Sequence, residues 1–127
     1  MAVVSSDQQS TPSLLTPIQA FKWFIDQGGK FNSGWENRVT RVIPRTAVPF
    51  TPLLTAPFIS VPVLMMIGKN DEMPLISRDV QLEVFHRIKS EKELYEIDGG
   101  HFGAIYPKSD LFYEAISKQS SFINTIA

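Results

Sequence analysis

The chain has 127 residues, of which 43% are hydrophobic and 20% charged, and its formal net charge is −1. This composition is typical of a folded globular domain, and it offers no basic surface for nucleic acid or for an anionic membrane. The absence of cysteine excludes disulfides, thiolate catalysis and cysteine-ligated metals, and it is typical of a reducing compartment, so a cytoplasmic location is expected.

The first half of the chain shows one helix and much irregular structure. Residues 1–15 are polar and predict a flexible leader, after which residues 16–127 are expected to form a single α/β domain. Thr16 and Pro17 are typical of a helix start, and apolar side chains then recur at helical spacing up to Gln27. The rest of residues 16–60 is a proline-rich, cap-like segment in which no long helix or central strand is expected. Its large apolar side chains are expected to pack inward: Phe31, Trp35, Phe50, Leu53 and Leu54.

The second half, residues 61–127, predicts a βαβα order of elements. The uninterrupted apolar run at 61–67 is typical of a strand covered on both faces, as in a parallel sheet. Ser77 can cap the helix that follows, and residues 94–97 predict a second short strand. A crossover of this length joins parallel strands, and residues 109–126 predict a last helix lying on the sheet. Nothing in the sequence indicates a signal peptide or a membrane-spanning segment.

A carboxylate and an imidazole follow the two predicted strands at equal distances. Asp71 lies four residues after Ile67, and His101 lies four residues after Ile97. The carboxyl ends of parallel strands share one edge of a sheet, where ligands bind in open α/β folds, and strands lie about 4.8 Å apart. The carboxylate would orient the imidazole through Nδ1–H and leave Nε2 to take a proton from a nucleophile. The glycines at 99–100 would allow a sharp turn and keep side chains away from the ring. An exposed loop histidine with no catalytic role is the simpler alternative.

Two motifs resemble those of the α/β-hydrolase superfamily. Residues 61–74 are similar to the penultimate strand and acid loop of that family, whose members often carry the pattern PvLxxxGxxDxxxP there, and Gly99-Gly100-His101-Phe102-Gly103 is similar to its histidine loop. The resemblance covers about residues 58–126 and implies the C-terminal βαβα part of a doubly wound parallel sheet, with residues 16–57 in the place of the cap.

The resemblance implies that Asp71 is the acid and His101 the general base of a serine hydrolase that cleaves an ester, amide or peptide bond of a small-molecule or peptide substrate. No cofactor or metal is expected. The nucleophile elbow G-x-S-x-G is absent from the sequence. Ser33 and Ser60 are the nearest candidates, but a turn role and a strand-edge role are expected for them. The chain is therefore predicted to be inactive alone.

A sheet of two strands would leave open edges and an exposed apolar face. We expect this face to be covered by a missing N-terminal half or by self-association, with a homodimer as the leading expectation. The alternative to a hydrolase fragment is a non-catalytic association or binding module derived from the same fold.

The remaining polar candidates have simpler interpretations. Glu72 is expected to be a solvated turn residue rather than the triad acid, and His86 a polar-face residue of the second helix. Asp98 with Asp71 and His101 is a weak signal for a metal site. Three arginines of the cap-like segment are expected to be solvated or salt-bridged rather than substrate-binding: Arg38, Arg41 and Arg45.

Overall fold

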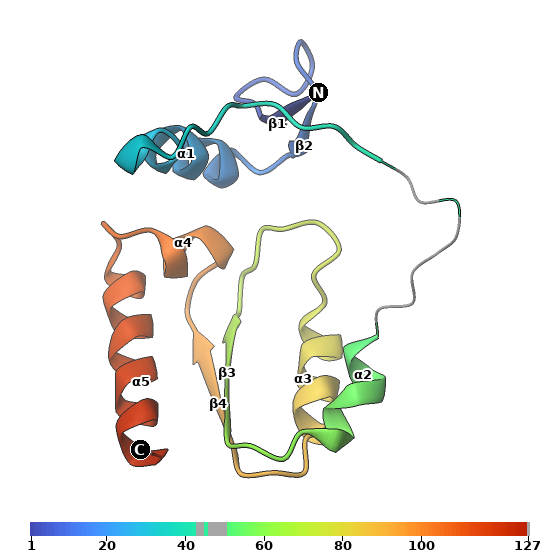
Figure 1. The fold of residues 1–127 in the computed structure, drawn as a ribbon, viewed down its shortest axis with the longest axis vertical. Helices are drawn as coiled ribbons and strands as arrows, with labels where there is room; N and C mark the ends of the chain where they lie inside the picture. Colours follow the sequence, from blue (N-terminus) through green and yellow to red (C-terminus); the bar gives the residue numbers. More distant parts are fainter. Residues whose placement is uncertain (43–44, 46–50, 127) are drawn as a thin grey trace. The chain divides into compact units, whose positions relative to one another are not determined.

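The chain forms a mixed α/β structure with small parallel sheets. The computed structural model describes residues 1–42, 45 and 51–126, and the chain divides into two compact units, Met1–Ala47 and Val48–Ala127 (Figure 1). From the sequence, residues 16–127 are expected to form a single α/β domain. The boundary between the two units falls inside the proline-rich segment.

The first unit contains two strands where a flexible leader was expected. Its elements are β1 (Ala2–Val4), β2 (Ser13–Leu15), α1 (Ile18–Gln27) and a 3-10 turn, η1 (Lys30–Asn32). β1 pairs with β2 in parallel. The Asn37 side chain fixes β1, because its Oδ1 accepts the N–H groups of Val3 and Val4, both at 3.0 Å, and its Nδ2 donates to the Val4 carbonyl at 2.9 Å. Val4 and Ala20 are buried in this unit.

Helix α1 begins one residue later than the sequence suggested. Pro17 occupies the N-cap position with ψ 137°, no side chain caps the helix, and Thr16 lies outside it. The helix ends at Gln27 as expected, and the N–H of its C-cap residue, Gly28, donates to the Phe24 carbonyl at 2.7 Å.

The expected inward packing of the irregular segment is only partly confirmed. The Trp35 ring lies 5.7 Å from the Phe24 ring. Phe31 is 97% exposed and has a positive φ of 59°, and Leu54 is also exposed. Phe50 lies outside the described residues.

The second unit follows the predicted βαβα order. Its elements are α2 (Pro52–Thr55), a 3-10 turn η2 (Ala56–Phe58), β3 (Val63–Gly68), α3 (Arg78–Arg87), β4 (Lys92–Ile97), α4 (His101–Ile105) and α5 (Asp110–Ile126). The Ser77 hydroxyl accepts the Val80 N–H at 3.4 Å and so caps α3 as predicted. The short helix α4, which begins at the histidine, was not predicted.

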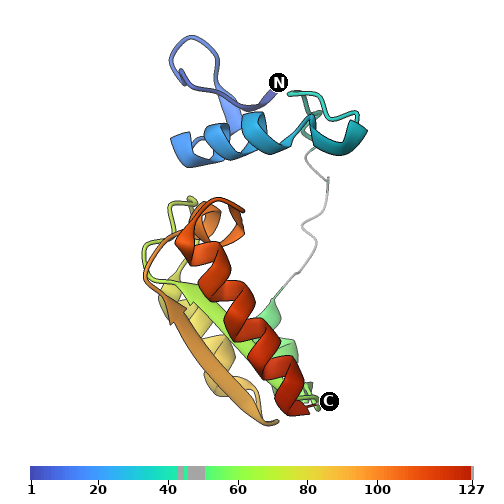
Figure 2. The ribbon, with the colours of Figure 1, turned by 90° about the vertical axis from the view of Figure 1, so that its left-hand side faces the viewer.

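β3 and β4 form a parallel pair that confirms the predicted βαβ unit. Their register runs from Val63 opposite Lys92 to Gly68 opposite Ile97. Helices α3 and α5 cover opposite faces of this pair (Figures 1 and 2). Buried apolar side chains come from both strands and the surrounding helices: Ile67, Ile88, Ile97, Phe102 and Ala115.

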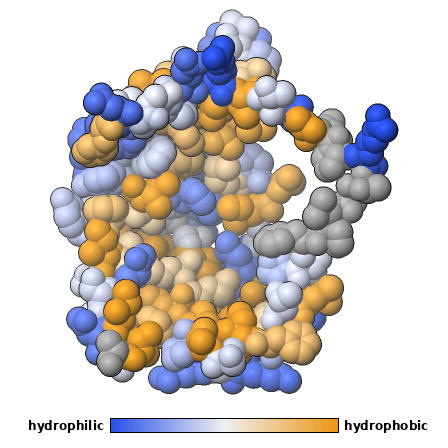
Figure 3. All heavy atoms as spheres, in the orientation of Figure 1, coloured by the Kyte–Doolittle hydropathy of each residue, from blue (hydrophilic) through white to orange (hydrophobic). Residues whose placement is uncertain are grey.

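Part of the apolar surface of this unit remains exposed. Within the apolar strand β3 only Ile67 is fully buried. Figure 3 shows hydrophobic residues at the surface near the end of α5. Four large side chains of this helix are exposed: Tyr113, Ile116, Ile123 and Ile126. Among the described residues, no helix combines the length and the apolar character needed to cross a membrane.

Candidate functional site

The loops after β3 and β4 leave the sheet at the same rim. Because the strands are parallel and in register, their carboxyl ends lie side by side. Backbone pairing continues past both strands, since the Lys69 N–H donates to the Ile97 carbonyl at 3.0 Å and the Asn70 N–H donates to the Gly99 carbonyl at 3.1 Å. This pairing holds the two loops together.

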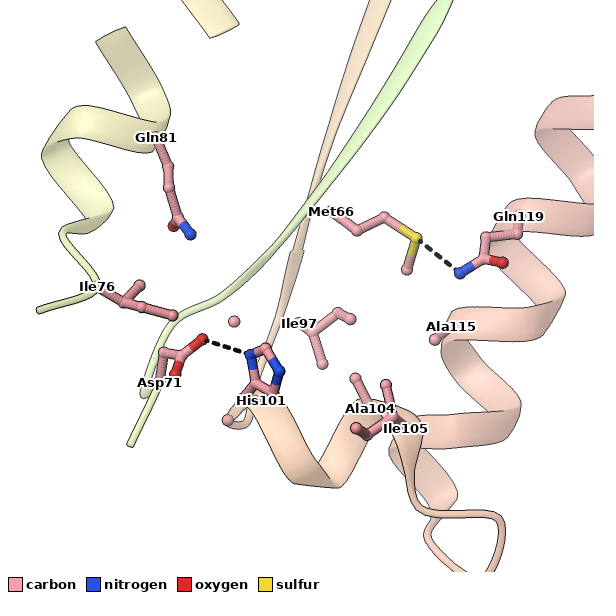
Figure 4. A pocket seen from close by; sticks show the side chains of 12 residues that line it. Met66, Asp71, Ile76, Gln81, Ile97, His101, Ala104, Ile105, Ala115 and Gln119 are labelled. Carbon is pink, nitrogen blue, oxygen red and sulfur yellow. Dashed lines mark hydrogen bonds and ion pairs between the residues drawn. The ribbon is translucent and has the colours of Figure 1, made fainter. Parts of the chain in front are cut away.

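Asp71 and His101 lie beside each other at this rim, as the sequence analysis predicted. Oδ2 of Asp71 is 3.4 Å from Nδ1 of His101 (Figure 4). Oδ1 of Asp71 accepts the Met73 N–H at 2.9 Å, so an Asx turn fixes the carboxylate. The Asp71 side chain is 13% exposed and that of His101 45% exposed. The acid is therefore sheltered while the imidazole is open to solvent.

This arrangement favours one tautomer of His101. A carboxylate beside Nδ1 favours the proton on that nitrogen and leaves the Nε2 lone pair free. The second ring nitrogen points away from Asp71 in Figure 4. The 3.4 Å separation is an ion-pair distance, longer by about 0.4–0.5 Å than a usual N–H···O hydrogen bond. Catalytic hydrogen bonds are often long in ligand-free sites and shorten when substrate binds.

Glu72 holds the histidine loop in place. Its Oε2 accepts the His101 N–H at 2.8 Å, and its Oε1 accepts the Phe102 N–H at 3.2 Å. These are the first two N–H groups of α4, whose N-cap residue, Gly100, has no side chain to satisfy them. The expectation that Glu72 is merely a solvated turn residue is therefore wrong: its carboxylate caps the helix that carries the imidazole.

Gly100 is needed for space rather than for an unusual backbone conformation. A Cβ at this position would lie 1.9 Å from Oε2 of Glu72 and 2.8 Å from the Asn70 carbonyl. Its φ of −108° and ψ of −174° are extended backbone that any residue adopts. From the sequence, this glycine is expected to allow a sharp turn and to leave space for the imidazole. The structure shows that the clearance serves the carboxylate of Glu72.

A pocket of about 310 Å³ adjoins the pair. Asp71 and His101 form part of its wall, and apolar side chains such as Ile76, Ile97 and Ile105 form much of the rest (Figure 4). Polar atoms come from Gln81 and Gln119 on either side. Within the described part of the chain, the buried Oε1 of Gln81 has no hydrogen-bond partner. The pocket thus offers an apolar space whose wall also contains the imidazole and two side-chain amides.

The two serines considered as nucleophiles lie in other settings. The Ser33 hydroxyl donates to the Gly28 carbonyl at 2.7 Å and accepts the Trp35 N–H at 3.3 Å, which confirms its turn role. Ser60 is exposed and lies in the segment between η2 and β3. Neither serine lies at a turn that leads from a strand into a helix, where a nucleophile elbow would lie.

The other polar candidates are not gathered at the site. Arg38 pairs with Glu36 at 2.6 Å, with both side chains largely exposed. His86 is exposed in the last turn of α3, and Asp98 is exposed after β4. Across residues 1–42, 45 and 51–126, no three histidine, aspartate or glutamate side chains lie together as metal ligands would.

No protein-family model, curated protein sequence or solved structure matches the chain. The resemblance to α/β-hydrolases therefore depends on the acid-loop and histidine-loop motifs themselves.

Proposed function

We propose that the second unit supplies the acid and the histidine of a serine hydrolase that acts on an ester, amide or peptide bond. The observation that supports this proposal is the Asp71 carboxylate beside Nδ1 of His101, at the carboxyl rim of a parallel strand pair and next to a pocket. Because the sequence contains no G-x-S-x-G motif, the nucleophilic serine and the oxyanion donors would come from another polypeptide segment.

The proposed chemistry uses His101 as base and then as acid. Its Nε2 accepts the proton of the serine hydroxyl while the serine oxygen forms a bond to the carbonyl carbon of the substrate. Nε2–H then gives this proton to the leaving group as the bond between carbon and leaving group breaks. A water molecule repeats both steps on the acyl-enzyme. Asp71 stabilises the imidazolium in each case, with Nδ1–H directed at its carboxylate.

An activated ester tests whether His101 has the reactivity that this role requires. In p-nitrophenyl acetate the Nε2 lone pair can attack the acetyl carbon and expel p-nitrophenolate, after which water hydrolyses the acyl-imidazole. We expect the purified chain to release p-nitrophenolate faster than the His101→Gln variant. Asp71→Asn should lower the histidine-dependent rate by about tenfold or more, because the wrong tautomer becomes favoured.

The chain contains matched controls for both substitutions. It has two histidines, and the exposed His86 serves as the control, so His86→Gln should keep most of the rate. Asp98→Asn, an exposed carboxylate near the same rim, should also keep it. Equal losses in the two histidine variants would mean that His101 behaves as a solvated side chain, and the proposal would fail. A fluorophosphonate probe that labelled the isolated chain would contradict the absence of a nucleophile.

The alternative, a non-catalytic association module, is favoured by a different observation, the open edge of β3.

A further inference from the structure

The two edges of the β3–β4 pair differ in chemical character. β4 carries charged side chains that are paired on both faces, with Glu96 bound to Arg78 of α3 and Glu93 bound to Lys118 of α5. Lys92 donates to the carbonyls of Phe85, His86 and Ile88 at the end of α3. Charged side chains of this kind protect an edge strand from pairing with other chains.

β3 has the composition of an interior strand. Its sequence, VLMMIG, contains no charged side chain. Strands of this type are found with neighbours on both sides, because an apolar strand at an edge invites further pairing. Yet among the described residues β3 pairs only with β4. β3 therefore lies at a sheet edge although its uncharged, apolar side chains are typical of an interior strand.

The backbone of β3 offers unpaired groups along the open edge. The Val63 N–H donates to the Glu91 carbonyl and the Lys69 N–H donates to the Ile97 carbonyl, both at 3.0 Å. In a parallel ladder alternate residues bond to the same neighbour, so the odd-numbered residues of β3 face β4. The N–H and C=O groups of Leu64, Met66 and Gly68 consequently face away from β4. Only an extended strand can satisfy these groups in regular order.

Uncharged side chains flank this edge on the α5 side. A hollow of about 350 Å³ is lined by Leu64, Met66, Gln119, Phe122 and Ile123. Ile116 and Ile126 share this side of α5 by helical spacing, and both are exposed. Figure 3 shows part of this apolar surface near the end of α5. A molecule that binds along the β3 edge would therefore also cover apolar area of α5.

We propose that the open edge of β3 binds β3 of a second copy of this chain, antiparallel and about a two-fold axis. A two-fold interface brings the same patch of both copies together, so the patch must be self-complementary. An uncharged apolar strand meets this condition, whereas the charged β4 would place like charges opposite one another.

Met66 lies at the centre of the proposed interface. With Met66 opposite Met66 of the partner subunit, Leu64 faces Gly68 of the partner subunit, and the two strands form about six backbone hydrogen bonds. The two pairs become one four-stranded sheet, and the apolar sides of the two α5 helices come together. This assembly does not depend on the proposed catalytic role of Asp71 and His101.

Light scattering and amide exchange test this interface on the full chain. Across about 1 to 100 µM we expect a concentration-dependent dimer of twice the chain mass. Amide exchange at Leu64, Met66 and Gly68 should slow as the concentration rises. The amides of Val63 and Met65, which face β4, should be protected at every concentration.

Two lysine substitutions on α5 provide the matched comparison. Ile123 is 58% exposed, so Ile123→Lys should preserve the fold while burying a charge at the interface, and it should weaken dimerisation by about tenfold or more. Ser121→Lys, on the opposite side of the same helix, should leave dimerisation unchanged. If the chain is monomeric at all concentrations, the proposal is wrong. The β3 edge would then be open to a strand of another polypeptide. A dimer with concentration-independent exchange at Leu64, Met66 and Gly68 would also overturn the proposal.

Discussion

Replacing Glu72 by alanine should loosen the histidine loop without touching the imidazole. The substitution removes an anionic acceptor from the N–H groups of His101 and Phe102. Loss of an N-cap costs about 0.5–2 kcal/mol, and hydrogen bonds to charged groups contribute about 1.5–3 kcal/mol. His101 is exposed and Phe102 is buried, so water can replace the carboxylate more readily at the N–H of His101 than at that of Phe102. We therefore expect the free energy of unfolding of the second unit to fall by about 1–2 kcal/mol.

Urea unfolding and amide exchange measure this effect. Exchange at the His101 and Phe102 amides should accelerate in Glu72→Ala, and Glu72→Gln should give a smaller change because one acceptor oxygen remains. Glu83→Ala is the matched control, since this carboxylate forms an exposed pair with Arg87 at 2.6 Å and should contribute only about 0.3–0.5 kcal/mol. If Glu72→Ala and Glu83→Ala destabilise equally and exchange at the two amides is unchanged, Glu72 does not cap α4.

Two further predictions concern other hydrogen bonds of the fold. The Tyr95 hydroxyl donates to the Glu114 carboxylate at 2.7 Å, and this bond raises the pKa of Tyr95 above its ordinary value. Because the folded-state pKa lies above the unfolded one, the stabilisation is fully present below about pH 10 and is lost as the pH rises through the folded-state pKa. As the pH rises above about 10, the urea concentration at the unfolding midpoint should therefore fall less steeply with pH in Tyr95→Phe than in the unmodified chain. The same dependence on pH in both proteins would contradict this prediction. Asn37→Ala removes three hydrogen bonds to β1 and should lower the stability of the first unit by about 1–3 kcal/mol, with faster amide exchange in β1. Unchanged exchange there would show that β1 is held by other contacts.

The proximity of Asp71 and His101 could be predicted from the sequence because it follows from strand direction. A connection long enough to contain a helix favours a parallel strand pair, and residues beyond the carboxyl ends of parallel strands share a rim. The acid follows β3 and the histidine follows β4, so two loops of similar length bring them together. Neither step requires knowledge of side-chain packing.

The role of Glu72 could not be predicted because it depends on a helix without the usual start signal. Helix α4 has glycine at its N-cap position, whereas sequence-based detection of a helix start relies on Ser, Thr, Asp or Asn there. The cap comes instead from a carboxylate 29 residues earlier in the chain. The sequence shows Gly100 before His101 and Glu72 after Asp71. Only the structure shows that the missing side chain of Gly100 leaves space for the Glu72 carboxylate.

The strands of the first unit were missed for a similar reason. β1 and β2 each have three residues, too few for a periodic pattern to emerge. The partner that fixes β1 is the amide of Asn37, separated from Val4 by 33 positions in the sequence. The polar residues around these short apolar segments therefore predict a flexible leader. In the structure, several of them form hydrogen bonds within the first unit.

The open edge of β3 and the candidate site are physically connected. Met66 and Gly68 contribute to the pocket that Asp71 and His101 also line, so any strand bound along β3 would form a new wall of this pocket. Such a wall would remove water from the side of the imidazole that now faces solvent. Electrostatic attraction grows as water is excluded, and the interaction between Nδ1–H of His101 and the Asp71 carboxylate would strengthen. Occupation of the β3 edge should therefore change the ring-nitrogen NMR shifts of His101 but not those of the distant His86, whichever polypeptide supplies the strand.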